Sequence, residues 1–297
     1  MTTRPSRDEA PTSRPTPTPT PTPTPSQMPA PTPAPGRSRS RARVRGIALG
    51  VVPLVALLAV VGFAPLPYSV ARPGQTTDVL GKHGGGEVIA VSGAPVRTTR
   101  GQLRMVAIQA TGPHVDIHLG QVVDAWFRPD RAVMPKDAVF PSGKSDAQVA
   151  QHNRADMKSS QRSAVAAALG LLHKDPDQVK VKLTLDDVGG PSAGLMFSLG
   201  IVDKLAGDGS GGDLTGGRTI AGTGTIDADG TVGAVGGAAL KTQAARRDGA
   251  SVFLVPQEEC AQVEPAPAGL RLVPVTTLKS AVQALRALAR GGTVPHC

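Results

Sequence analysis

Apolar and polar residues alternate in short runs along the middle of the chain. Between residues 68 and 140 the stretches EVIAVSG, QLRMVAIQATG, HVDIHLG and VVDAWFRP are separated by turn-forming residues, a pattern typical of β-strands. The alternation in HVDIHL places His114 and His118 on a strand rather than on a helix. We therefore expect a small β-rich region in this part of the chain.

Helical and extended patterns follow each other from residue 145 to residue 290. Helical composition runs over residues 146–172, with Ser145 placed as the N-cap. The strict alternation of VKVKLTL, residues 179–185, predicts a strand with one solvent-exposed face. Later segments predict a hairpin around Asp229-Gly230, a helix in GGAALKTQAARRDGA, a strand in SVFLVP and a closing helix in TTLKSAVQALRALAR. Together these elements predict an α+β fold.

The stretch GGPSAGLMFSLG, residues 189–200, joins a loop to a strongly apolar helix. Five apolar residues follow Ser192 at helical spacing: Leu195, Met196, Leu199, Val202 and Leu205. Phe197 and Ile201 add to this apolar face, so that the helix is apolar on nearly all sides. We expect this helix to be buried. Ser192 is then either a helix cap or a nucleophile, since free N–H groups and the helix dipole at this end favour an oxyanion. A nucleophilic serine also needs a base.

Lys241 is the candidate base, because no histidine has a comparable setting and a buried neutral lysine accepts a hydroxyl proton. On a helical wheel small apolar residues surround it and the neighbouring arginines point away: Ala238, Ala244 and Ala245 against Arg246 and Arg247. This geometry predicts a lysine in a dry interface, where desolvation lowers its pKa. The alternative is a solvated surface lysine.

Composition separates the first 45 residues from the rest. They contain TPTPTPTPTP, Thr16 to Pro25, which favours polyproline II and offers no apolar face to bury. Eight arginines against Asp8 and Glu9 give this segment +6 of the chain's +9. The high pI therefore describes a disordered basic tail. Phe, Tyr and Trp together are too few for base-stacking platforms, so we expect no nucleic-acid partner.

Residues 46–64, GIALGVVPLVALLAVVGFA, carry no charge and reach about 28 Å as a helix. We expect a transmembrane anchor in the cell membrane. The arginine cluster before it places the tail in the cytoplasm and everything after residue 64 outside. The alternative is a cleaved signal peptide, but a 45-residue leader is unusually long, and Pro65 and Pro67 follow without a small-x-small cleavage site.

The two cysteines and six histidines are scattered and give no metal-ligand spacing, so we expect no metal site. An extracytoplasmic setting permits a disulfide between Cys260 and Cys297, but the pairing stays open because Cys297 is the last residue.

The stretch AVFPSGKS, residues 138–145, fits the loose form of a phosphate-binding loop through Lys144. Pro141 removes one N–H donor, Gly143 is its one glycine, and no suitable buried strand ending in Asp follows. We expect neither a nucleotide nor another cofactor. A nucleotide-binding protein using Lys144 remains an alternative that nucleotide titration tests.

Four separated motifs resemble the Lon proteolytic domain. They are GGPSAG, TGTI, DGTVGAVGG and a lysine four residues after the last glycine of that third motif. The resemblance covers residues 145–290. It implies Ser192 as nucleophile and Lys241 as general base, with supporting residues around them: Thr223, Gly190, Pro191 and Ala193.

The wider plan resembles the membrane-anchored, ATP-independent Lon-like proteases of bacteria. Three features carry this resemblance: the single N-terminal anchor, the stretch PLPYSVARPG just after it, and the stretch ADMKSSQ ahead of the Lon-like part. It implies a serine endopeptidase outside the cytoplasmic membrane that cleaves polypeptides through an acyl-enzyme. Resemblance to Lon also implies a homo-oligomeric ring.

Three departures from these families bear on the function. The ATPase module of energy-dependent Lon enzymes has no counterpart in the sequence, and Gly189 stands where many of them have Asp. Only residues 172–188 separate the ADMKSSQ helix from the serine motif, too few for the PDZ module that the membrane-anchored proteases usually insert there. Peptide capture must then come from elsewhere or be absent. The alternative is a catalytically silent membrane scaffold of the same fold.

We therefore expect five parts along the chain: a disordered tail (1–45), a transmembrane helix (46–64), a β-rich region (65–144), a Lon-like proteolytic domain (145–290) and a C-terminal tail (291–297).

Overall fold

The computed structural model describes residues 38–140, 145–185 and 190–297, and its contacts divide the chain into two units at residues 56 and 57. Helix α1 (Ser38–Phe63) is the first element. In the described ranges, we find no helix with the length and apolar content that crossing a membrane requires.

Residues 1–37 of the expected tail lie outside the described residues, whereas residues 38–45 form the start of α1. The expectation of disorder was wrong for these eight residues. They contain neither proline nor glycine, and arginine and alanine are good helix formers.

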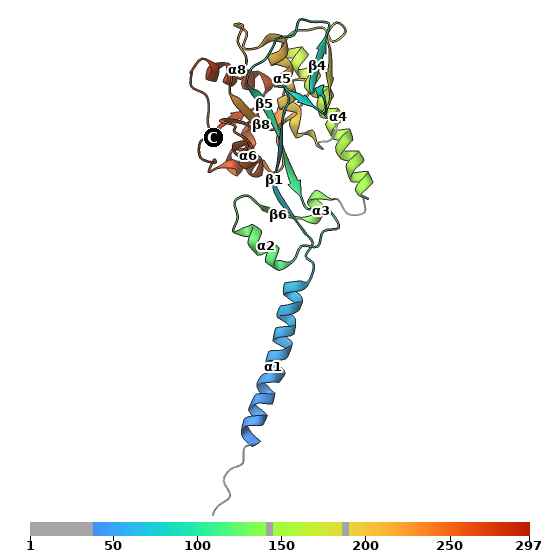
Figure 1. The fold of residues 1–297 in the computed structure, drawn as a ribbon, viewed down its shortest axis with the longest axis vertical. Helices are drawn as coiled ribbons and strands as arrows, with labels where there is room; N and C mark the ends of the chain where they lie inside the picture. The colour runs from blue at the N-terminus through green and yellow to red at the C-terminus, as the bar shows by residue number, and fades with distance from the viewer. Residues whose placement is uncertain (1–37, 141–144, 186–189) are drawn as a thin grey trace, which may run out of the picture. The chain divides into compact units, whose positions relative to one another are not determined.

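A six-stranded mixed sheet organises residues 57–297 (Figure 1). Its order is β12 (Arg271–Val275), β11 (Val252–Pro256), β8 (Thr219–Gly222), β5 (Gln102–Ala110), β1 (Tyr68–Asp78) and β6 (Ala132–Pro135). The first four are mutually parallel, and β1 runs antiparallel to both its neighbours. The sheet takes strands from both sides of residue 145, so the expected boundary at residues 144 and 145 lies inside one compact unit.

Helices and short strands complete this unit. The helices are α2 (Leu119–Trp126), α3 (Lys136–Val139), α4 (Asp146–Leu171), α5 (Gly194–Ala206), α6 (Ala238–Arg247), α7 (Cys260–Val263) and α8 (Leu278–Ala289), with 3₁₀ turns η1 (Pro191–Ala193) and η2 (Gln257–Glu259). The short strands are β2 (Lys82–His83), β3 (Gly86–Glu87), β4 (Ile89–Ser92), β7 (Lys180–Leu183), β9 (Thr225–Ile226) and β10 (Val232–Gly233).

Apolar cores lie on both faces of the sheet. Alternate residues of a strand point to opposite faces. Val252 and Leu254 of β11 therefore join the core that contains α5 and α8, whereas Phe253 and Val255 join the core that contains α6. All five residues of β11 are buried, which explains its continuous apolar run. The expected mixture of helices and strands is confirmed.

Several expected elements are present where the sequence placed them. Ser145 caps α4 by accepting a hydrogen bond from the backbone N–H of Gln148, whose side chain accepts in return from the backbone N–H of Ser145. Strand β7 pairs with β4, and β9 pairs with β10 around Asp229-Gly230. Helix α5 is buried from Gly194 to Lys204.

The expected strands over residues 114–127 were wrong. Ile117 makes only an isolated bridge, and residues 119–126 form α2. Val122 and Ala125 lie three residues apart and are both buried, which a helix achieves on one face and a strand does not. An apolar run this short does not distinguish the two periods.

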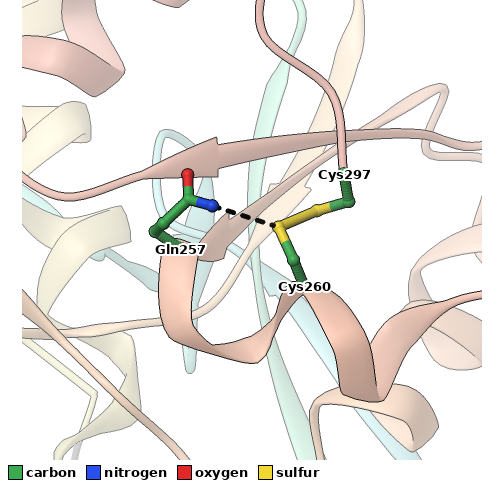
Figure 2. The surroundings of a disulfide bond; sticks show 3 residues. All are labelled: Gln257, Cys260 and Cys297. Atoms are coloured by element: carbon green, nitrogen blue, oxygen red, sulfur yellow. Dashed lines mark hydrogen bonds between the residues drawn. A yellow bond between two sulfur atoms is a disulfide. The ribbon is translucent and has the colours of Figure 1, made fainter.

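Cys260 and Cys297 form a disulfide, with their Cα atoms 5.2 Å apart (Figure 2). Both residues pack against the core beneath α6, and the amide of Gln257 lies 4.0 Å from the sulfur of Cys260. The disulfide ties the end of the chain to α7.

Candidate active site

Ser192 lies in η1, at the start of the buried helix α5. Gly190 precedes it with φ 92°, a conformation that glycine adopts without a steric penalty. Pro191 occupies the first helical position, where its missing N–H costs nothing. Ser192 is half-buried and lines a cavity, so its side chain is placed where a substrate can reach it.

The backbone around Ser192 is held from two sides. Gly224 N donates to the carbonyl oxygen of Ser192 at 3.0 Å. From α4, Ser160 Oγ donates to the carbonyl oxygen of Pro191 at 2.8 Å. A Cβ on Gly194 would lie 2.8 Å from Ser160 Oγ and 2.6 Å from Ile226, so the glycine of PSAG is required by close packing. Sequence reasoning missed the support from Ser160, although it lies within ADMKSSQ.

Lys241 lies on α6, which begins after Gly237 in the left-handed conformation with φ 69°. Its side chain is buried, with 3% exposed, and three surrounding alanines are each 1% exposed or less: Ala238, Ala244 and Ala245. Arg246 and Arg247 are exposed. The helical-wheel prediction is therefore confirmed, and Lys241 is not a solvated surface lysine.

Burial lowers the pKa of Lys241 to about 8, and the negative charge of Glu259 opposes this by favouring the ammonium form. Glu259 is 3% exposed. Its Oε1 accepts from Val235 N at 3.1 Å, and its buried Oε2 has no hydrogen-bond partner within the described residues. No pattern in the sequence singles out Glu259, because acids at the start of a short helix are usually solvated.

Thr223 connects the two predicted catalytic residues. Lys241 Nζ donates to Thr223 Oγ1 at 3.0 Å, and Thr223 Oγ1 donates to the carbonyl oxygen of Ser192 at 3.2 Å. Thr223 is fully buried, and its own N–H bonds to the carbonyl of Leu254 in β11. The fold thus brings together three residues that the sequence analysis named separately. In this arrangement the lysine bonds to the threonine and not directly to Ser192 Oγ.

Ser192 and Lys241 line the same cavity, of about 630 Å³. The remaining walls come from β5, from β1 and from the loop before α6: residues 105–109, 74–75 and 234–236, with Met157 of α4 and Thr225. The pairing of β5 with β8 ends at Met105 and Gly222. Residues 106–109 of β5 then continue along the cavity beyond that pairing.

A β-bulge shapes one wall. The register between β1 and β5 shifts between Pro73 and Thr76, and Gly74 in the bulge lines the cavity. Arg247 at the end of α6 donates to the carbonyl oxygen of Gly74 at 2.7 Å. Sequence reasoning missed this feature, for which Pro73-Gly74 was the available signal.

The described residues contain no group of three or more His, Cys, Asp or Glu side chains able to hold a metal ion. Residues 141–144 of the loop that resembles a phosphate-binding site lie outside the described residues, and Lys144 is among them. The expectation that no nucleotide binds stays a prediction.

Comparison with protein families finds a match over part of the chain. Residues 176–286 match the family model described as the Lon protease (S16) C-terminal proteolytic domain. The matched segment contains Ser192, Thr223 and Lys241. A search of curated proteins finds no match. Residues 176–286 are therefore similar to the proteolytic domain of Lon proteases.

Proposed function

We propose that the protein is a serine endopeptidase in which Ser192 is the nucleophile and Lys241 the general base. The observation that carries this proposal is the burial of Lys241 beside Thr223, in a cavity that Ser192 also lines. A lysine whose pKa is about 8 is partly neutral near neutral pH, and only the neutral amine accepts a proton.

The reaction proceeds by acyl transfer. Ser192 Oγ bonds to the substrate carbonyl carbon as its proton passes to Lys241 Nζ. Backbone N–H groups at the start of η1, which have no partner within the helix, stabilise the oxyanion. The C–N bond then breaks, and Lys241 returns the proton to the leaving amine. Water attacks the acyl-Ser192 in the same way, releasing the carboxylic acid and restoring both residues.

We propose that the polypeptide substrate lies extended along residues 106–109 of β5. These residues line the cavity past the last pair that β5 makes with β8. A strand with unused N–H and C=O groups accepts an extended peptide as an additional strand. Peptide capture by this edge offers one replacement for a PDZ module.

We further propose a membrane-anchored enzyme with its N-terminus in the cytoplasm and its protease domain outside. The charge-free segment 46–64 behind a cluster of arginines supports this arrangement. So does the disulfide between Cys260 and Cys297, because disulfides persist in oxidising compartments. Protease added to intact cells should trim the chain after residue 64 and spare the Pro-Thr tail.

Serine–lysine acyl transfer consumes no nucleotide, so we propose that hydrolysis is ATP-independent. Resemblance to Lon proteases supports a homo-oligomeric assembly, which sedimentation of the purified full chain tests. Hydrolysis that starts only when ATP is added would contradict the first of these proposals.

A serine-directed fluorophosphonate probe tests the catalytic proposal. We expect covalent labelling of the wild-type chain at Ser192, found by mass spectrometry, and none in Ser192→Ala. Ser159→Ala is the matched control, because Ser159 is an exposed serine on α4 and its loss should leave labelling unchanged. Absence of labelling in the folded wild-type chain would favour the silent scaffold instead.

A further inference from the structure

Helix α2 carries two apolar faces, and only one of them is buried. Val122 and Ala125 face the protein, with 8% and 2% exposed. Leu119, Val123 and Trp126 are 38%, 45% and 80% exposed. Leu119 and Val123 are four positions apart, and Val123 and Trp126 are three positions apart. This spacing places the three residues in one stripe along the helix.

The exposed stripe continues past the end of the helix. Phe127 follows Trp126 and is 84% exposed. The chain contains one Trp and five Phe residues, so two of its few large aromatic side chains stand next to each other in solvent. Contiguous exposed apolar surface of this kind marks an interaction site.

Charged groups near the stripe pair with one another on another side of α2. Asp124 bonds to Arg128 at 2.9 Å and to Arg131 at 2.7 Å. On the helical wheel Asp124 lies about 160° from Trp126. The apolar stripe is therefore bounded by a separate, internally paired polar face.

The start of α2 is bonded to the chain just after the charge-free segment 46–64. Leu66 N donates to the carbonyl oxygen of Ile117 at 2.8 Å, and Ile117 lies two residues before the helix. Lys136 N donates to the carbonyl oxygen of Pro67 at 2.9 Å, which joins the end of β6 to the same segment. A bilayer that holds residues 46–64 would end two residues before Leu66.

We propose that Leu119, Val123, Trp126 and Phe127 form a lipid-contacting surface that rests on the bilayer. This inference rests on the proposed membrane anchor. Tryptophan and phenylalanine favour the boundary between head groups and acyl chains, and amphipathic helices lie in that plane. The hydrogen bond between Leu66 and Ile117 holds the start of α2 close to the end of the proposed anchor. This position favours lipid as the partner of the exposed stripe over a protein located away from the membrane.

The tryptophan of this surface provides the test, because Trp126 is the one tryptophan in the chain. The full chain is reconstituted into phosphatidylethanolamine and phosphatidylglycerol vesicles, with and without lipids brominated near the top of the acyl chains. We expect blue-shifted Trp126 emission in vesicles and a loss of intensity with brominated lipid. Val123→Ser combined with Phe127→Ser should reduce that loss.

A relocated tryptophan serves as the control. Val96 is 46% exposed and lies outside α2, so Val96→Trp combined with Trp126→Phe should show no quenching. Flotation of the vesicles reports the anchor separately. Protein that floats while Trp126 is not quenched would overturn the lipid contact and leave the anchor standing, whereas protein that does not float would overturn both. A blue shift that follows protein concentration and not brominated lipid would assign the surface to a second copy and overturn the proposal.

Discussion

Lys241 and Thr223 are joined by a hydrogen bond of 3.0 Å between Nζ and Oγ1, and the same hydroxyl donates to the carbonyl oxygen of Ser192. The threonine therefore holds the amine of Lys241 in a fixed relation to the backbone of Ser192. Because Lys241 and Thr223 are both buried, water cannot easily replace either bond.

Activity should rise with pH through the pKa of Lys241, about 8. The neutral amine is the active form, so kcat/KM should be low well below pH 8 and level off above it. Lys241→Arg, Lys241→Met and Lys241→Gln should all be inactive, since none of these side chains accepts the serine proton. Peptide hydrolysis across a pH series measures both effects. Substantial turnover by folded Lys241→Met would return Ser192 to the role of a helix cap.

Lys241 should also cost stability at neutral pH. Its pKa falls from 10.5 in the unfolded chain to about 8 in the fold, a penalty of about 3 kcal/mol below pH 8. Stability lost to this residue is regained between pH 8 and 10.5, because there only the unfolded chain keeps the proton. The free energy of unfolding of Lys241→Met should therefore exceed that of the wild type by up to about 3 kcal/mol at pH 7. The lost hydrogen bond to Thr223 reduces this difference, which should disappear near pH 11.

Urea unfolding at several pH values measures this difference. Lys241→Arg is the contrasting variant: it should be the least stable of the three proteins, because its charge cannot be discharged by deprotonation. A stability difference between wild type and Lys241→Met that did not change with pH would contradict the assigned pKa.

Removing the hydroxyl of Thr223 should slow the reaction without removing the nucleophile. Thr223→Val keeps the shape of the side chain but leaves Lys241 without its partner, and a lost hydrogen bond to a charged group amounts to about a ten- to hundredfold effect on rate. Thr223→Ser, which keeps the hydroxyl, is the control and should retain most activity. Equal kcat/KM for the Val and Ser variants would show that this bond does not position Lys241.

The two residues proposed as catalytic could be selected from the sequence because each has a local signal. Ser192 precedes an apolar helix, and Lys241 has alanines on its own helical face and arginines away from it. Their connection through Thr223 was expected only from the resemblance to Lon. The periodicity of the segments around Ser192 and Lys241 does not predict which helix packs beside which strand.

The rest of the site depends on contacts between distant segments. Glu259 is the one buried residue of η2, and nothing in its own neighbourhood in the sequence predicts this burial. Strands β1 and β12 each contain a proline, Pro73 at the bulge and Pro274 on an edge strand. Both positions tolerate a residue without an N–H, but only the sheet order shows that they do.

The charge of Glu259 should set where the pH profile of the enzyme lies. Its carboxylate raises the pKa of Lys241 against the effect of burial, so Glu259→Gln should lower that pKa further and move the rising limb of kcat/KM to lower pH. The glutamine keeps an oxygen able to accept the 3.1 Å hydrogen bond from Val235 N, and the cavity wall should hold its shape. Glu258→Gln removes a neighbouring exposed charge and should leave the profile in place. If both variants lowered kcat/KM equally at every pH, Glu259 would be a structural residue and not a determinant of the protonation state of Lys241.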